Sequence, residues 1–283
     1  MRTARLNLAA LALALFAVGS VGLGARCLSA TEARCSVASL TGHAPKLDVP
    51  YAVTRPELIE RMLDMAELRP GDRVLDLGTG DGRILLAAAR RGASGLGVDI
   101  DPVLVVEASE AAARAGLSSR ARFAARDLFA TPLGGHDVVT MFLLPEVNMR
   151  LRSRLLAELA PGARIVSHAF DMGDWRPDGS AQVGGARLYL WRVPARVAGT
   201  WRLVEDDEEA RLVLTQRFQN VGGALTRAGR SLPIADVRLD GARLRFAVEE
   251  GGTRRVFEGE VRGGAIIGQG WRATRLSPPA PLL

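Results

Sequence analysis

The sequence of 283 residues has few of the side chains that hold metals or cross-link a fold. It contains two cysteines and three histidines, and neither set has the spacing of a zinc site. The sequence therefore predicts no metal centre. Cys27 and Cys35 both precede the first segment with the pattern of a folded domain, so a disulfide between them would not join parts of a core. Aromatic residues make up only 5%, which argues against a polytopic membrane protein with aromatic belts.

Lysine is almost absent, because Lys46 is the only one and every other cationic side chain is an arginine. The net charge of +6 at pH 7 would by itself be compatible with a nucleic-acid-binding protein. The arginines, however, alternate with acidic residues along the chain and form no single stripe, so we interpret them as a solvated surface and predict no nucleic-acid partner. The hydrophobic fraction of 48% and the charged fraction of 24% are those of a globular protein, which excludes a disordered or coiled-coil chain.

The N-terminus has the pattern of a targeting or anchoring segment. Arg2 and Arg5 precede an uncharged, mainly apolar run at residues 6–25, as in a signal peptide. The run is also about as long as a bilayer is thick. We therefore predict that residues 1–30 are a signal peptide or a membrane anchor and that residues 31–49 are a linker. The protein is expected to be membrane-anchored or exported to the cell envelope, and the flanking charges do not fix its orientation.

Strand and helix patterns alternate from residue 50 to residue 195. The alternation predicts a Rossmann-like α/β domain with a mostly parallel sheet that is covered on both faces, and ligands of such sheets bind beyond the carboxyl ends of the strands. The last strand alternates polar and apolar residues, which favours an antiparallel edge strand. The strands are expected at 73–77, 95–100, 121–125, 137–144, 163–170 and 187–193, and the helices at 56–66, 84–91, 102–115 and 147–159.

The pattern changes in residues 196–276, where short runs of period two are separated by glycine turns. Such runs predict a small antiparallel β domain, and residues 277–283 are expected to form a tail. No catalytic constellation occurs in this half, and the acidic run 205–209 is interpreted as a solvated turn. The strands are expected at 199–204, 210–218, 244–248, 254–261 and 265–267, and the turns at 222–223, 240–241, 251–252 and 263–264.

Residues 74–83 carry the strongest functional signal. Their sequence, Val-Leu-Asp-Leu-Gly-Thr-Gly-Asp-Gly-Arg, indicates a buried strand, a glycine-rich turn that a ligand can approach closely, and the start of a helix. The glycines fall at every second position and so lack the G-x-G-x-x-G spacing of a dinucleotide site. Asp76 and Asp81 would also repel a pyrophosphate. The loop therefore favours a cationic ligand such as S-adenosylmethionine.

Acidic residues also follow the next two predicted strands. Asp99 ends the second strand, where a carboxylate can accept hydrogen bonds from both hydroxyls of a ribose. Asp127 follows the third strand, where a carboxylate and a backbone amide can read the edge of an adenine. Because the carboxyl ends of parallel strands meet at one edge of a sheet, these acidic groups and the loop match the parts of one nucleoside–amino acid ligand.

Together these motifs resemble those of the class I S-adenosylmethionine-dependent methyltransferases, over roughly residues 51–193. Asp76 and the loop glycines match the first motif of that family, Asp99 matches its ribose-binding acid, and Asp127 matches its adenine-side acid. The resemblance implies methyl transfer with S-adenosylmethionine as cofactor. The cofactor-binding residues that it implies are Asp76, Gly78, Thr79, Gly80, Asp81, Gly82, Asp99, Ile100, Asp127 and Leu128.

Three segments look like those of the small protein-lysine methyltransferases that act on mitochondrial membrane proteins, and of their bacterial relatives. They are residues 51–54 (Tyr-Ala-Val-Thr), the glycine loop, and residues 142–145 (Phe-Leu-Leu-Pro). This narrower resemblance implies a lysine amine of a protein as methyl acceptor, and association with a membrane through the N-terminal segment. Many amine methyltransferases carry an Asn/Asp-Pro-Pro-aromatic motif after the fourth strand, whereas residues 143–146 here are Leu-Leu-Pro-Glu.

The acceptor side has several candidate residues, and each has a purely structural alternative. Tyr51 is expected to cover the cofactor or to pack on the first helix. Glu146 is expected to line the acceptor site or to favour a helix N-terminus through its charge. His168 is interpreted as a core histidine or a base, and Trp175 as a side chain that closes over the acceptor or packs on its own loop. We predict Tyr51, Glu146 and Trp175 as the residues that position the substrate.

Two classes of function remain from the sequence. The first is a methyltransferase that works by in-line displacement, in which the enzyme mainly positions the reactants and excludes water. The second is an envelope binding protein, in which the Rossmann-like domain holds S-adenosylmethionine without catalysis and the β domain binds a partner. Labelled cofactor distinguishes them, because only the enzyme transfers the label.

Overall fold

The computed structural model describes residues 52–278 and residue 282. The predicted anchor and linker, both cysteines and Tyr51 lie outside the described residues. Within the described part of the chain, every helix is too short or too polar to cross a bilayer. In the same part, no cluster of three or more His, Cys, Asp or Glu side chains could hold a metal ion.

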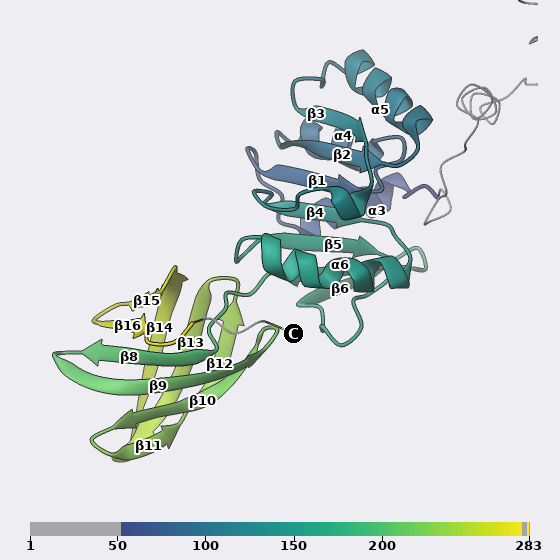
Figure 1. The fold of residues 1–283 in the computed structure, drawn as a ribbon. Helices are drawn as coiled ribbons and strands as arrows, with labels where there is room; N and C mark the ends of the chain where they lie inside the picture. Colours follow the sequence, from purple (N-terminus) through teal and green to yellow (C-terminus); the bar gives the residue numbers. More distant parts are fainter. Residues whose placement is uncertain (1–51, 279–281, 283) are drawn as a thin grey trace, which may run out of the picture. The chain divides into compact units, whose positions relative to one another are not determined.

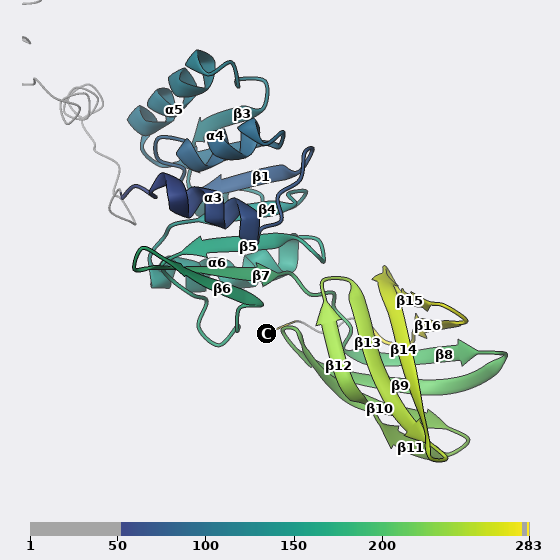
Figure 2. The same ribbon diagram turned by 180° about the vertical axis from the view of Figure 1, so that it is seen from behind.

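The first domain is built on a seven-stranded sheet with the order β3-β2-β1-β4-β5-β7-β6. Strands β1 to β5 run parallel, whereas β7 is antiparallel to β5, and β6 is antiparallel to β7. Figure 1 shows α6 in front of the sheet, and Figure 2 shows α3 and α4 on its other face. In chain order the elements are α3 (Pro56–Met65), β1 (Arg73–Leu77), α4 (Arg83–Arg90), β2 (Ser94–Asp99), α5 (Pro102–Arg114), β3 (Ala121–Ala125), the 3₁₀ turn η1 (Leu128–Ala130), β4 (Val138–Met141), α6 (Pro145–Glu158), β5 (Arg164–His168), β6 (Gly179–Val183) and β7 (Ala186–Arg192).

Apolar side chains cover both faces of the sheet, which explains why the central strands are continuous apolar runs. One core lies against α6 and includes Leu75 and Leu151. The other lies against α3 and α4 and includes Leu63 and Val74. Successive residues of β1 therefore point into different cores, as the alternation of side chains along a strand requires.

The second domain is a nine-stranded antiparallel sheet with the order β11-β10-β9-β8-β16-β15-β14-β13-β12. Strand β10, near one edge of the sheet, also contacts β12 at the other edge, so the sheet is nearly closed into a barrel. Large aromatic side chains fill its interior, and the rings of Phe246 and Phe257 stack with centroids 5.0 Å apart. The strands are β8 (Gly199–Glu205), β9 (Glu208–Arg217), β10 (Asn220–Arg227), β11 (Arg230–Pro233), β12 (Ala235–Asp240), β13 (Arg243–Glu250), β14 (Thr253–Arg262), β15 (Ala265–Gly268) and β16 (Trp271–Arg275).

The structure confirms the predicted fold class and corrects parts of the β domain. The predicted strands 73–77 and 121–125 have the observed bounds, and the acidic run forms the turn between β8 and β9. The turn predicted at 222–223 is wrong, because both glycines lie inside β10. A Cβ on Gly223 would lie 2.0 Å from the carbonyl oxygen of Val213 on β9, so this glycine is needed where two strands approach closely. Five strands were not predicted: β6, β10, β11, β12 and β16.

Candidate cofactor and acceptor site

The glycine loop connects β1 to α4 at the carboxyl edge of the parallel strands. The backbone amides of Gly78 and Thr79 both donate to the carbonyl oxygen of Val98, each over 2.9 Å, so the loop is fastened to the neighbouring strand β2. Gly78 and Gly82 have φ angles of 72° and 79°, a left-handed conformation that favours glycine. The spacing of the glycines therefore reflects the tight turn that brings the loop backbone to the edge of the sheet.

Asp76 lies beneath this loop and is 1% exposed. The hydroxyl of Thr79 donates to one carboxylate oxygen over 2.7 Å, and the hydroxyl of Thr140 donates to the other over 2.6 Å. Burial raises the pKa of Asp76 to about 6, although both hydroxyl hydrogen bonds act in the opposite direction. The structure thus refines the predicted role of Asp76, because a carboxylate at this depth acts on a ligand through the loop that it holds and through its charge.

The raised pKa makes the stability of the protein depend on pH. Because Asp76 binds its proton more tightly in the folded protein than in the unfolded chain, stability falls as pH rises from about 4 to above 6. A rise in pKa from 3.8 to about 6 corresponds to about 3 kcal/mol. We expect Asp76→Asn to remove this dependence on pH. Relative to the wild type, the free energy of unfolding of the variant should therefore increase by about 3 kcal/mol between pH 4 and pH 7. Urea unfolding of both proteins measures the difference, and a constant difference across this range would contradict the assignment.

Asp99 ends β2 beside the glycine loop. One carboxylate oxygen accepts the amide N–H of Gly80 over 2.8 Å, and the other accepts that of Asp101 over 3.0 Å. The side chain is only partly buried, and each oxygen keeps a further lone pair. Asp99 therefore links the first motif to β2 and can still accept hydrogen bonds from a ligand. Ile100, the next residue, is an exposed apolar side chain at the same edge.

Asp127 follows β3 and is exposed. One of its carboxylate oxygens accepts the amide N–H of Phe129 over 2.7 Å and so caps the turn η1. Leu128 is half-buried against the core under this turn. The three strand ends thus bring Asp99, Asp127 and the glycine loop to one edge of the sheet, as the sequence predicted.

Asp81, one of the two loop acids expected to repel a pyrophosphate, is paired in the structure. Both of its carboxylate oxygens accept hydrogen bonds from Nε of Arg83, over 2.9 and 3.0 Å. The guanidinium of Arg83 also donates to the backbone carbonyl of Thr54 over 3.3 Å. The ion pair reduces the negative potential that the sequence suggested, and it ties the segment before α3 to the cofactor loop.

A small cleft lies between this segment and the loop. Its walls are the residues Ala52, Val53, Thr54, Gly78, Thr79, Gly80, Asp81, Arg83, Ile84 and Phe142. The cleft and the adjacent strand ends fit S-adenosylmethionine, since they offer carboxylates and the exposed backbone of Gly78. Gly78 and Gly80 would border the amino-acid portion of the cofactor, Asp99 would hold the ribose, and Ile100, Asp127 and Leu128 would border the adenine.

The acceptor side of the cleft has an aromatic and a histidine side chain in contact. The rings of Phe142 and His168 have centroids 3.9 Å apart, and Nδ1 of His168 is hydrogen-bonded to the hydroxyl of Thr54 over 3.2 Å. Burial, together with the nearby charge of Arg55, lowers the pKa of His168, which keeps the imidazole neutral at pH 7. Thr54 and Phe142 line the cleft and His168 lies behind them, so His168 positions these two side chains.

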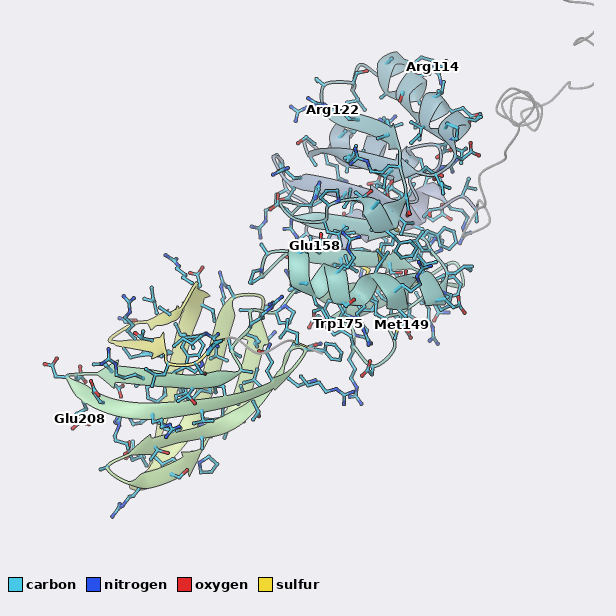
Figure 3. All side chains as sticks on the ribbon, viewed as in Figure 1. Arg114, Arg122, Met149, Glu158, Trp175 and Glu208 are labelled. Atoms are coloured by element: carbon cyan, nitrogen blue, oxygen red, sulfur yellow. The ribbon has the colours of Figure 1, made fainter. Side chains whose placement is uncertain are left out.

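The other two residues predicted to position the substrate, Glu146 and Trp175, lie on the surface and in a core, respectively. Glu146 is exposed in the first turn of α6, where its charge favours the helix N-terminus. Trp175 is 0% exposed, and its ring stacks on Phe218 with centroids 5.9 Å apart (Figure 3). The prediction that Trp175 closes over the acceptor is therefore wrong, because the side chain is held in a core. The contact between Phe142 and His168 was not predicted, although Phe142 follows β4 and His168 ends β5 at the carboxyl edge.

Comparison with known proteins gives consistent results. Residues 76–179 match the family model described as the ANTKMT methyltransferase domain. A protein-lysine N-methyltransferase of Saccharolobus islandicus is 39% identical over 131 residues, which are 46% of this chain and 81% of the relative. The adenine nucleotide translocase lysine N-methyltransferase of Mus musculus is 37% identical over 149 residues, and the match covers 52% of this chain and 65% of that relative.

Among solved structures, an RNA methyltransferase from Salinibacter ruber in complex with S-adenosyl-L-homocysteine is 42% identical, with a TM-score of 0.51. The match covers 52% of this chain and 96% of that one. The motifs, the sheet order and the geometry of the loop agree with these similarities. The chain therefore belongs to the class I S-adenosylmethionine-dependent methyltransferases.

Proposed function

We propose that the protein transfers a methyl group from S-adenosylmethionine to a lysine amine of a protein. The observation that carries the proposal is the extent of the match to the ANTKMT methyltransferase domain, which runs from the cofactor loop at residue 76 to residue 179. It therefore includes Phe142 and His168 on the acceptor side. Two relatives of this chain are named as lysine N-methyltransferases of proteins.

The chemistry of the cleft suits a neutral amine. S-adenosylmethionine supplies a methyl group on a sulfonium, whose sulfur leaves as a neutral thioether. The lysine nitrogen must arrive without its proton, because its lone pair forms the new N–C bond as the S–C bond breaks. The ring of Phe142 offers a partly apolar surface, with the neutral His168 buried behind it, and such a surface lowers the pKa of an ammonium that enters it. The proton that the lysine ammonium loses before the attack is released to water, and the product is a methylated ammonium.

The proposal includes a place of action. The apolar run at residues 6–25 supports association with a membrane, so we propose that the acceptor is a protein of the membrane or the envelope. Protease accessibility in intact cells determines on which side the methyltransferase domain lies.

The test incubates the full-length protein with labelled S-adenosylmethionine and three acceptor pools: membrane proteins, soluble proteins and total RNA. We expect label in membrane proteins, and mass spectrometry should place it on lysine. Label in RNA alone would overturn the proposed acceptor. Binding of the cofactor without transfer to any pool would favour the non-catalytic alternative.

The hydrogen bond between Thr54 and His168 makes a separate prediction. Thr54→Val removes the hydroxyl at nearly constant shape, and loss of a buried hydrogen bond is worth about 1–3 kcal/mol. We expect kcat to fall about tenfold, while the Kd of S-adenosylmethionine changes less than about threefold. Thr54→Ser keeps the hydroxyl and is expected to retain nearly full kcat. Equal losses in the two variants, or a loss only in cofactor affinity, would refute this positioning role.

A further inference from the structure

A second groove, which we call the arginine groove, lies away from the glycine loop, over β1, β2 and β3. Its walls are Arg73, Ser94, Gly95, Leu96, Ser119, Arg120, Arg122, Arg126, Thr131, Pro132, Gly134 and His136. Only the short turn η1 follows β3 before β4 begins, so among the described residues no helix covers β3 on the side of α6. Figure 1 shows this uncovered face, and Figure 3 shows Arg122 on the edge strand β3.

The charge of the arginine groove is of one sign. Four arginines line it and no carboxylate does. All four are exposed, and in residues 52–278 none of them takes part in an ion pair. The guanidinium of Arg120 donates only to the carbonyl oxygen of Gly92, over 2.8 Å.

Several other arginines in the same domain are neutralised. Arg91 pairs with Glu60 and Asp64, and Arg164 pairs with Asp72 over 2.8 Å. Clustered cations without acidic partners repel one another and raise the local concentration of anions. The arginine groove is distinguished by the four arginines that it gathers with no acid among its lining residues.

We propose that the arginine groove binds the anionic headgroups of phospholipids at a membrane surface. Guanidinium groups match phosphate in charge and in hydrogen-bond geometry. The apolar run at residues 6–25 supports the choice of lipid. With that run in a bilayer, the described domain stays within about 90 Å of the membrane, because the chain between them can extend no further. The inference therefore rests on the membrane association included in the proposed function.

This binding orients the domain relative to the bilayer. Arg126 directly precedes Asp127, on the adenine side of the cofactor site, so the arginine groove reaches the carboxyl edge of the sheet. The groove runs from the amino ends of the strands, where Arg73, Ser94 and Arg120 lie, to Arg126 at the carboxyl edge, so bound headgroups would place this whole face of the sheet against the membrane. A lysine near the bilayer interface then comes within reach of the cleft between Thr54 and Phe142.

The test uses the full-length protein and vesicles of phosphatidylcholine, with or without about one-third phosphatidylglycerol. The measured quantity is the additional binding to the anionic vesicles, since the apolar run can bind both kinds. We expect Arg122→Gln/Arg126→Gln to reduce this additional binding about tenfold to thirtyfold. The matched control Arg230→Gln/Arg238→Gln removes the same charge from exposed positions of the β domain and is expected to change it less than about threefold.

Amide hydrogen exchange locates the contact. We expect anionic vesicles to protect residues 119–126 and 131–137 in the wild type, and neutral vesicles to leave them unchanged. Equal loss of binding in both double variants, or no protection of these segments, would overturn the proposal. Protection by a single-stranded RNA and not by vesicles would identify a nucleic-acid site instead. Absence of methyl transfer would contradict the proposed function alone, because these binding measurements need no turnover.

Discussion

Asp99→Ala is expected to weaken the binding of S-adenosylmethionine by at least a hundredfold. Hydrogen bonds to a charged group contribute about 1.5–3 kcal/mol each, and the family resemblance assigns both ribose hydroxyls to this carboxylate. The substitution also removes the acceptor of the Gly80 amide, which is 2.8 Å from Asp99, so the loop is expected to loosen. Isothermal titration calorimetry measures the change in Kd.

The control for this result is Asp99→Asn, which keeps one acceptor oxygen and the shape of the side chain. It is expected to bind S-adenosylmethionine with an affinity between those of the wild type and the alanine variant. Thermal unfolding verifies that both variants are folded, because Asp99 is only partly buried and contributes little to either core. An unchanged Kd in Asp99→Ala would show that the cofactor binds elsewhere.

Gly82→Ala is expected to destabilise the protein by about 2–5 kcal/mol. Gly82 has a φ of 79°, which is unfavourable for any residue with a Cβ. A Cβ built there would lie 2.6 Å from Cζ of Phe123 and 2.9 Å from Cβ of Ala108. Both contacts are far inside normal packing distances, so β3 and α5 would have to move away from the cofactor loop.

Gly116→Ala separates the two causes of this effect. Gly116 has a similar φ of 68°, but nothing lies within 4 Å of a Cβ built there. Gly116→Ala is therefore expected to lower the free energy of unfolding only through the unfavourable backbone conformation, by about 1–2 kcal/mol. Urea unfolding of the two variants gives the difference, which measures the packing contribution at Gly82. Equal destabilisation would mean that the loop and β3 can separate freely.

The site could be predicted from the sequence where its geometry is local. Gly78 and Gly82 mark the turn, and the acids Asp99 and Asp127 mark ends of neighbouring strands. Parallel strands bring such ends to one edge whatever the surrounding contacts are. The acceptor side could not be predicted in the same way, since Thr54 and His168 meet across 114 residues of chain.

Residue periodicity and the backbone preferences of glycine are local properties, so the sequence predicts the Rossmann-like domain, the cofactor loop and the antiparallel character of the second domain. Which polar groups are buried or paired depends on contacts that form only in the folded protein. Asp76 became a support of the loop because Thr140, 64 residues away, donates to it, and Trp175 became a core residue. The groove arginines have no acidic partner among the described residues, because no helix covers β3 on the side of α6, whereas arginine and acid alternate along the chain. Burial and pairing are properties of contacts between distant segments, and no local pattern encodes them.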